Sequence, residues 1–144
     1  MTASGSPVVR VERDIAAPPD AVFDAWTDPA SVSVWMAPDR MTVAAAECDP
    51  RVGGVFRIVM VGEAGAVEHT GVYEQVSRPR RLVFTWRSPY LGERTTRVRV
   101  DFTAIPGGTR MVIEHCGLPV PDAEDHQRGW AGIAAKLVSA LQRG

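Results

Sequence analysis

The segment 121–144 constrains the fold more than any other part of this chain. After Pro121 it contains no further proline, and its apolar residues recur at helical spacing. Asp122 suits the N-cap, and Glu124 and Asp125 would place negative charge at the positive end of the helix dipole. Lys136 is expected on the polar side. The opposite, narrow face carries His126, Trp130, Ile133, Ala134, Leu137 and Leu141. The sequence therefore predicts one long amphipathic helix that must cover an apolar surface.

The residues before the predicted long helix are expected to form that surface. Two short helices are predicted at 20–27 and 29–35, the second with Asp28 as N-cap and Pro29 at its first position. Alternating apolar residues and intervening turn residues predict strands at 8–15, 41–47, 55–61, 67–76, 82–86, 95–102 and 109–116. We expect an α+β domain over 1–144, with 1–7 as a flexible tail. Its curved antiparallel sheet of six or seven strands would hold the long helix on its concave face.

Composition excludes several classes of partner. The chain has 16 Lys and Arg against 17 Asp and Glu, a formal net charge of −1, so no basic surface for nucleic acid or an anionic membrane is expected. No signal peptide or membrane-spanning run is visible, and we expect a cytoplasmic protein. Cys48 and Cys116 match no metal or redox spacing and are expected to be buried free thiols.

A curved sheet that grips a single helix often leaves space between the two, and that space is a candidate ligand pocket. The side chains expected to point inward include Phe56, Ile58 and Met60 on one strand and Phe84 and Trp86 on another. The tryptophans allow two interpretations. For Trp26 the core is favoured, whereas Trp35 and Trp130 fit either the core or a pocket wall.

The sequence contains few residues arranged for catalysis. It has no phosphate-binding glycine loop, nucleophile elbow or metal-binding motif, so no catalytic residue, metal or cofactor is predicted. His69, His115 and His126 could meet in space, but no two of them have a ligand spacing, and hydrogen-bonded core histidines are the alternative. Gly129 is costly inside a helix, which indicates either loose constraint in a first turn or close approach of another group.

Several stretches, taken together in order and spacing, resemble a known family over residues 8–143. They are Ala17-Pro18 with Val22-Phe23, Thr27-Asp28-Pro29 followed by Trp35, the run 49–57 with Gly53-Gly54, Gly71-Val72-Tyr73, the run 81–86, Thr109 with His115-Cys116-Gly117-Leu118, and His126 with Gly129-Trp130. This set resembles the activator-of-heat-shock-protein-ATPase homologue family of the START/birch-pollen-allergen superfamily.

The resemblance implies a helix-grip fold with a hydrophobic cavity between sheet and helix. The superfamily includes lipid and hormone carriers, polyketide cyclases and chaperone-associated proteins, and the family name adds a link to chaperones and stress response. The leading hypothesis is a binding protein for a small apolar molecule. A chaperone-linked interaction module, a homodimer, or a cyclase- or hydrolase-like enzyme using His115 or His126 remain alternatives. The candidate ligand-binding residues are Trp35, Phe56, Ile58, Met60, Tyr73, Phe84, Trp86, Val100, His115, His126, Trp130 and Ile133.

Overall fold

Seven strands and three helices follow one another in the order that the sequence predicts. The computed structural model describes residues 8–143, so the predicted tail at 1–7 lies outside the described residues. The elements are β1 (Val9–Ile15), α1 (Pro19–Thr27), α2 (Pro29–Trp35), β2 (Thr42–Cys48), β3 (Val55–Gly62), β4 (Gly65–Ser77), β5 (Arg81–Trp86), a 3-10 turn (Pro89–Leu91), β6 (Thr96–Ile105), β7 (Gly108–Cys116) and α3 (Val120–Arg143). The α+β class is confirmed.

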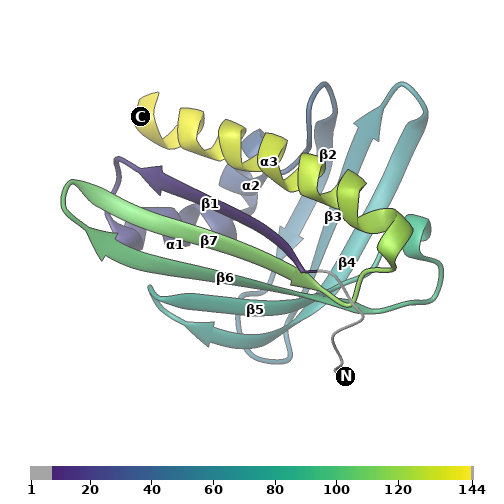
Figure 1. Ribbon diagram of the computed structural model, residues 1–144, viewed down its shortest axis with the longest axis horizontal. Helices are drawn as coiled ribbons and strands as arrows, with labels where there is room; N and C mark the ends of the chain where they lie inside the picture. Colours follow the sequence, from purple (N-terminus) through teal and green to yellow (C-terminus); the bar gives the residue numbers. More distant parts are fainter. Residues whose placement is uncertain (1–7, 144) are drawn as a thin grey trace.

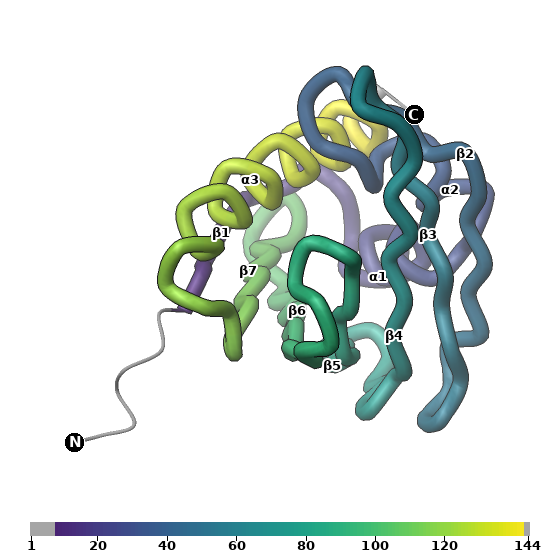
Figure 2. Tube along the Cα trace, turned by 90° about the vertical axis from the view of Figure 1, so that its right-hand side faces the viewer, coloured from purple at the N-terminus to yellow at the C-terminus, as the bar shows by residue number. Residues whose placement is uncertain are grey.

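The strands form one antiparallel sheet in the order β1-β7-β6-β5-β4-β3-β2. Consecutive strands from β2 to β7 pair with one another, β5 and β6 through a loop that contains the 3-10 turn, and β1 forms the far edge by pairing with β7. The sheet curls into an open half-barrel, and α3 lies across its concave side (Figures 1 and 2). The predicted helix-grip arrangement, with two short helices after the first strand, is therefore present.

A glycine in β4 permits a close approach of the neighbouring strands. At Gly71, an added Cβ would lie 1.9 Å from the carbonyl oxygen of Thr85 and 2.4 Å from the Phe56 ring. Only glycine allows the neighbouring groups to approach this closely. Two residues later, between Tyr73 and Gln75, the pairing of β4 with β5 shifts register. The β2–β4 part of the sheet stands at an angle to the rest of the strands (Figure 2).

The apolar face of α3 packs as predicted, and two details of the helix differ. Trp130, Ile133, Ala134 and Leu137 are buried. The helix begins at Val120, so Asp122 lies in the first turn and is not the N-cap. Pro121 fits that turn because the first helical N–H groups need no helical partner. Lys136 does not extend into solvent: its Nζ donates to the carbonyl oxygens of Ala37 and Met41, at 2.6 and 3.0 Å.

The short helices close one end of the half-barrel and complete the core. Asp28 caps α2 by accepting from the backbone N–H of Ala30 at 3.1 Å, as predicted. Trp26 is buried against Phe84 and Phe102, which confirms its place in the core. Cys48 and Cys116 are free thiols, but both are half-buried and not fully enclosed. No helix in the described part of the chain is long and apolar enough to cross a membrane.

Candidate functional site

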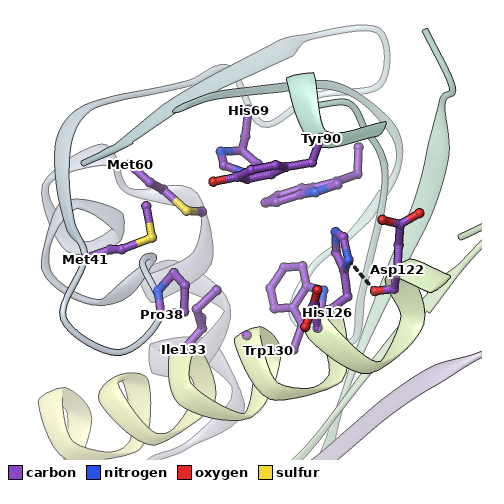
Figure 3. A pocket seen from close by; sticks show the side chains of 12 residues that line it. Pro38, Met41, Met60, His69, Tyr90, Asp122, His126, Trp130 and Ile133 are labelled. Atoms are coloured by element: carbon purple, nitrogen blue, oxygen red, sulfur yellow. Dashed lines mark hydrogen bonds between the residues drawn. The ribbon is translucent and has the colours of Figure 1, made fainter. Parts of the chain in front are cut away.

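A cavity of about 410 Å³ lies between the first turns of α3 and the curled edge of the sheet. Figure 3 shows side chains from α3, from the strands and from two loops pointing into this shared space. Most of the wall is apolar or aromatic. The lining residues are Pro38, Met41, Met60, His69, Trp86, Tyr90, Asp122, Asp125, His126, Gly129, Trp130 and Ile133.

The sheet side of the cavity contains two buried polar groups without a partner among the described residues. Trp86 is 3% exposed and His69 is 6% exposed, and their rings lie 5.0 Å apart. Neither Nε1 of Trp86 nor Nδ1 of His69 has a hydrogen-bond partner within residues 8–143. Burial lowers the pKa of His69 to about 4. His69 is therefore neutral at pH 7. Unpartnered buried polar groups are uncommon in proteins and mark this wall as unusual.

His115 lies behind the cavity wall and does not line it. The hydroxyl of Thr96 donates to the carbonyl oxygen of Trp86 at 2.9 Å, so it accepts the 2.7 Å hydrogen bond from Nε2 of His115. Nδ1 of His115 in turn accepts from the indole N–H of Trp130 at 3.0 Å. Both ring nitrogens are occupied and the residue is 0% exposed. His115 therefore positions Trp130 and offers no free ring nitrogen to a molecule in the cavity.

His126 lines the cavity, and one of its two ring nitrogens has no hydrogen-bond partner in the described structure. Its Nδ1 donates to the backbone carbonyl oxygen of Asp122 at 2.9 Å, one turn back in α3 (Figure 3). This bond fixes the ring orientation and leaves Nε2 without a protein partner in the described structure. The ring packs edge-on against His115, with centroids 5.3 Å apart. His126 can therefore exchange a proton or a hydrogen bond with a molecule in the cavity.

The loop between α2 and β2 forms a further part of the cavity wall, beside β3. Pro38 and Met41 of this loop line the cavity, and the ammonium group of Lys136 holds the loop through the Ala37 and Met41 carbonyls. Burial lowers the pKa of Lys136, and the Asp39 carboxylate opposes that effect. One cation on α3 thus fixes the segment that completes the cavity.

The three histidines do not form a metal site. Trp86 lies between His69 and His115, with ring centroids 5.0 and 6.1 Å from them. Across residues 8–143, no group of three His, Cys, Asp or Glu side chains is close enough to hold a metal ion. The histidines instead serve the cavity wall and the hydrogen-bond chain behind it.

Comparison with known proteins identifies the family. The sequence model of the family described as "Activator of Hsp90 ATPase homolog 1-like protein" matches residues 16–142. This chain belongs to that family. Among curated proteins, no sequence matches it.

Solved structures of this family share the fold. The activator-homologue protein of Silicibacter pomeroyi is 26% identical, with a TM-score of 0.81 over 94% of this chain and 98% of its own. A family member from Aeromonas hydrophila is also 26% identical, with a TM-score of 0.81 over 95% and 93%. A protein of Chromobacterium violaceum, 22% identical, has a TM-score of 0.82 over 94% and 97% and shows the fold alone.

Within this family fold, the predicted site residues fall into three groups. Met60, Trp86, His126, Trp130 and Ile133 line the large cavity. Phe56, Ile58, Tyr73 and Phe84 line, together with Trp86, a separate void of about 20 Å³ that can hold no more than a water molecule. Trp35, Val100 and His115 are buried and line neither space.

Sequence reasoning missed the loop residues of the wall. Pro38 and Tyr90 lie outside the long helix and the strands, where periodicity gives no signal, and Met41, expected as the first residue of a strand, precedes β2. The sequence predicts Asp122 as the N-cap and Asp125 beside the helix dipole, and neither as a lining residue. Two lining residues do have a sequence signal: His69 as one of three histidines that could meet in space, and Gly129 as a glycine in a helical pattern.

Proposed function

We propose that this protein binds a small, largely apolar molecule in the cavity between α3 and the sheet. The observation that carries the proposal is the cavity itself, about 410 Å³ in volume and lined by Trp, Met and Ile side chains. Binding pockets for small molecules typically measure about 300 to 1,000 Å³ and combine apolar walls with a few polar groups. A cavity of about 150 Å³ already accommodates benzene, so this one has room for two or three fused rings.

The polar groups support binding of a molecule with at least one hydrogen-bonding function. Nε2 of His126, Nε1 of Trp86 and Nδ1 of His69 have no hydrogen-bond partner among residues 8–143. A ligand that supplied partners to the buried Trp86 and His69 nitrogens would recover part of the free energy lost by burying them, about 1 to 3 kcal/mol for each group. A ligand with an apolar body and one or two polar atoms thus matches the side chains that line the cavity.

Fluorescent-probe binding tests the proposal. N-phenyl-1-naphthylamine is uncharged and fluoresces in apolar surroundings, so its emission should rise on titration with the protein. Met60→Trp would fill the cavity from β3 and should weaken binding at least about tenfold. Val55→Trp is the matched control, because Val55 lies on the same strand with its side chain exposed. Equal binding by wild type and Met60→Trp, with both variants folded, would refute the proposal.

An enzymatic role is a second candidate because of His126. Its imidazole is oriented by the Asp122 carbonyl, and its other nitrogen meets a cavity able to hold a substrate. A positioned histidine of this kind can act as a general acid or base. Any turnover found in an ester or lactone panel should fall at least about a hundredfold in His126→Gln. Turnover unchanged in that variant would exclude the role.

A further inference from the structure

The cavity changes in polarity along its length. Its inner part is formed by Met60, Trp86, Trp130 and Ile133, all of which are buried. Its outer part is formed by Asp122, which is half-buried, and by Asp125 and Tyr90, which are exposed. A ligand that fits both parts has an apolar body at one end and a polar group at the other.

The charge at the outer part is negative. The lining includes two carboxylates and no lysine or arginine. Arg128, outside the lining, pairs with Asp125 and Glu124. Asp122 has no ion-pair partner among the residues the structure describes, so its charge is not neutralised by the protein.

Other positive groups near this end do not compensate that charge. Lys136 lies on the same helix but donates to the Ala37 and Met41 carbonyls and does not line the cavity. His69 is buried and uncharged at neutral pH. The positive end of the α3 dipole opposes the carboxylates only in part, since it amounts to about half an elementary charge.

Aromatic rings also line both parts of the cavity. Tyr90 lines the outer part, and Trp86 and Trp130 line the inner part. Rings of this kind attract cations through their negatively charged faces. A carboxylate at the outer end would be repelled by Asp122.

We infer that the cavity selects an amphiphilic organic cation: an apolar ring system that lies among Met60, Trp130 and Ile133, with a protonated amine beside Asp122. This inference rests on the proposed function, because it names the class of ligand for the same cavity. It excludes fatty acids and other anionic amphiphiles as preferred ligands. The geometry requires the positive group at the outer end, where water and the carboxylate solvate it, and not in the apolar interior.

Three naphthalene compounds that differ only in the attached group test the inference. They are 2-(aminomethyl)naphthalene, which is cationic at pH 7, neutral 2-methylnaphthalene and anionic 2-naphthoate. Displacement of N-phenyl-1-naphthylamine at low ionic strength gives the three affinities under conditions that limit screening. We expect the amine to bind about tenfold tighter than the neutral compound, and the carboxylate to bind weakest.

Asp122→Asn removes the charge and keeps the shape of the side chain. It should reduce the affinity for the amine to about that for the neutral compound, leave the neutral compound unaffected, and strengthen binding of the carboxylate. Glu124→Gln is the matched control: it removes one charge in the same helical turn, outside the lining, and should leave the order of affinities unchanged.

Each outcome separates the two proposals. If none of the three compounds binds, the proposed function fails and this inference fails with it. If all three bind equally, or the carboxylate binds tightest, the apolar cavity stands and the cation preference is refuted. If the amine is preferred and Asp122→Asn leaves that preference intact, Asp122 is not the group that recognises it.

Discussion

The indole N–H of Trp130 donates to Nδ1 of His115 across 3.0 Å, and this bond joins the long helix to the last strand of the sheet. Thr96 continues the chain by accepting from Nε2 of His115 and donating to the Trp86 carbonyl. The directions of these bonds require neutral His115 with its proton on Nε2. The bonds therefore hold Trp130 and Trp86, which line the cavity, through His115 and Thr96, which do not.

The bond predicts coupling between the two residues. His115→Leu should lower the free energy of unfolding by about 1 to 3 kcal/mol, because the Trp130 N–H is left buried without an acceptor. Trp130→Phe removes the donor, so the double variant should lose less than the sum of the single losses, by about 1 kcal/mol. Urea denaturation of the four proteins measures this difference. Additive losses would show that the bond does not stabilise the fold.

Two buried histidines predict loss of stability in mild acid. Burial lowers the pKa of His69 to about 4 and that of His115 to about 3, from an ordinary value of 6.5. Below pH 6.5 the unfolded chain binds protons that the folded chain does not, so stability falls as pH falls. Between pH 7 and 5 the free energy of unfolding should decrease by about 2 kcal/mol for each histidine.

Denaturation of wild type, His69→Gln, His115→Gln and the double variant at a series of pH values tests whether the two histidines cause the loss of stability. Each variant is expected to be less stable than wild type at pH 7 but to lose less stability on acidification to pH 5. The carboxylates contribute little to the change in the free energy of unfolding between pH 7 and 5, since most of them are still ionised in this range. Identical pH dependence in wild type and the double variant would assign the loss to other groups.

Gly129 lies in α3 beside the cavity, where an added Cβ would meet no other residue within 4 Å. Gly129→Ala should therefore raise the free energy of unfolding by about 0.5 to 1 kcal/mol through helix propensity alone. Gly129→Leu should extend into the cavity and weaken ligand binding at least about tenfold.

Ala135 is exposed on the same helix, so Ala135→Leu is the control for the added side-chain volume. Melting temperatures and the probe titration measure both effects. The assignment of Gly129 to ligand access is contradicted if Gly129→Leu is folded and binds the probe as wild type does.

Lys136→Met should loosen the loop between α2 and β2. The variant keeps the apolar stem but leaves the Ala37 and Met41 carbonyls without their donor, at a cost of about 1 to 3 kcal/mol. Hydrogen exchange around residues 37–41 should quicken. Arg128→Met is the comparison, because the ion pairs of Arg128 are exposed and contribute less than about 1 kcal/mol. Equal exchange in both variants would show that Lys136 does not hold the loop.

The amino-acid sequence alone determined the elements and the buried face of the long helix. Alternation in the strands and the 3.6-residue period in α3 are local patterns, and each element buries the face that its own pattern marks, as Val98 and Val100 in β6 and Leu137 in α3 illustrate. The Asp28 cap and the core position of Trp26 followed from equally local signals.

Only the tertiary structure decided which inward side chains line the cavity. Phe56 and Met60 share one face of β3, yet Met60 lines the cavity and Phe56 lies in the core, because the Phe56 ring packs over Gly71 and against Tyr73 and Phe84. His115 and His126 were equivalent candidates in the sequence, but the chain from Trp130 to Thr96 occupies one and leaves the other free. Pro38, Met41 and Tyr90 come from loops whose positions depend on distant contacts, such as that of Lys136 with Ala37. Such contacts join residues about a hundred positions apart, and local periodicity carries no information about them.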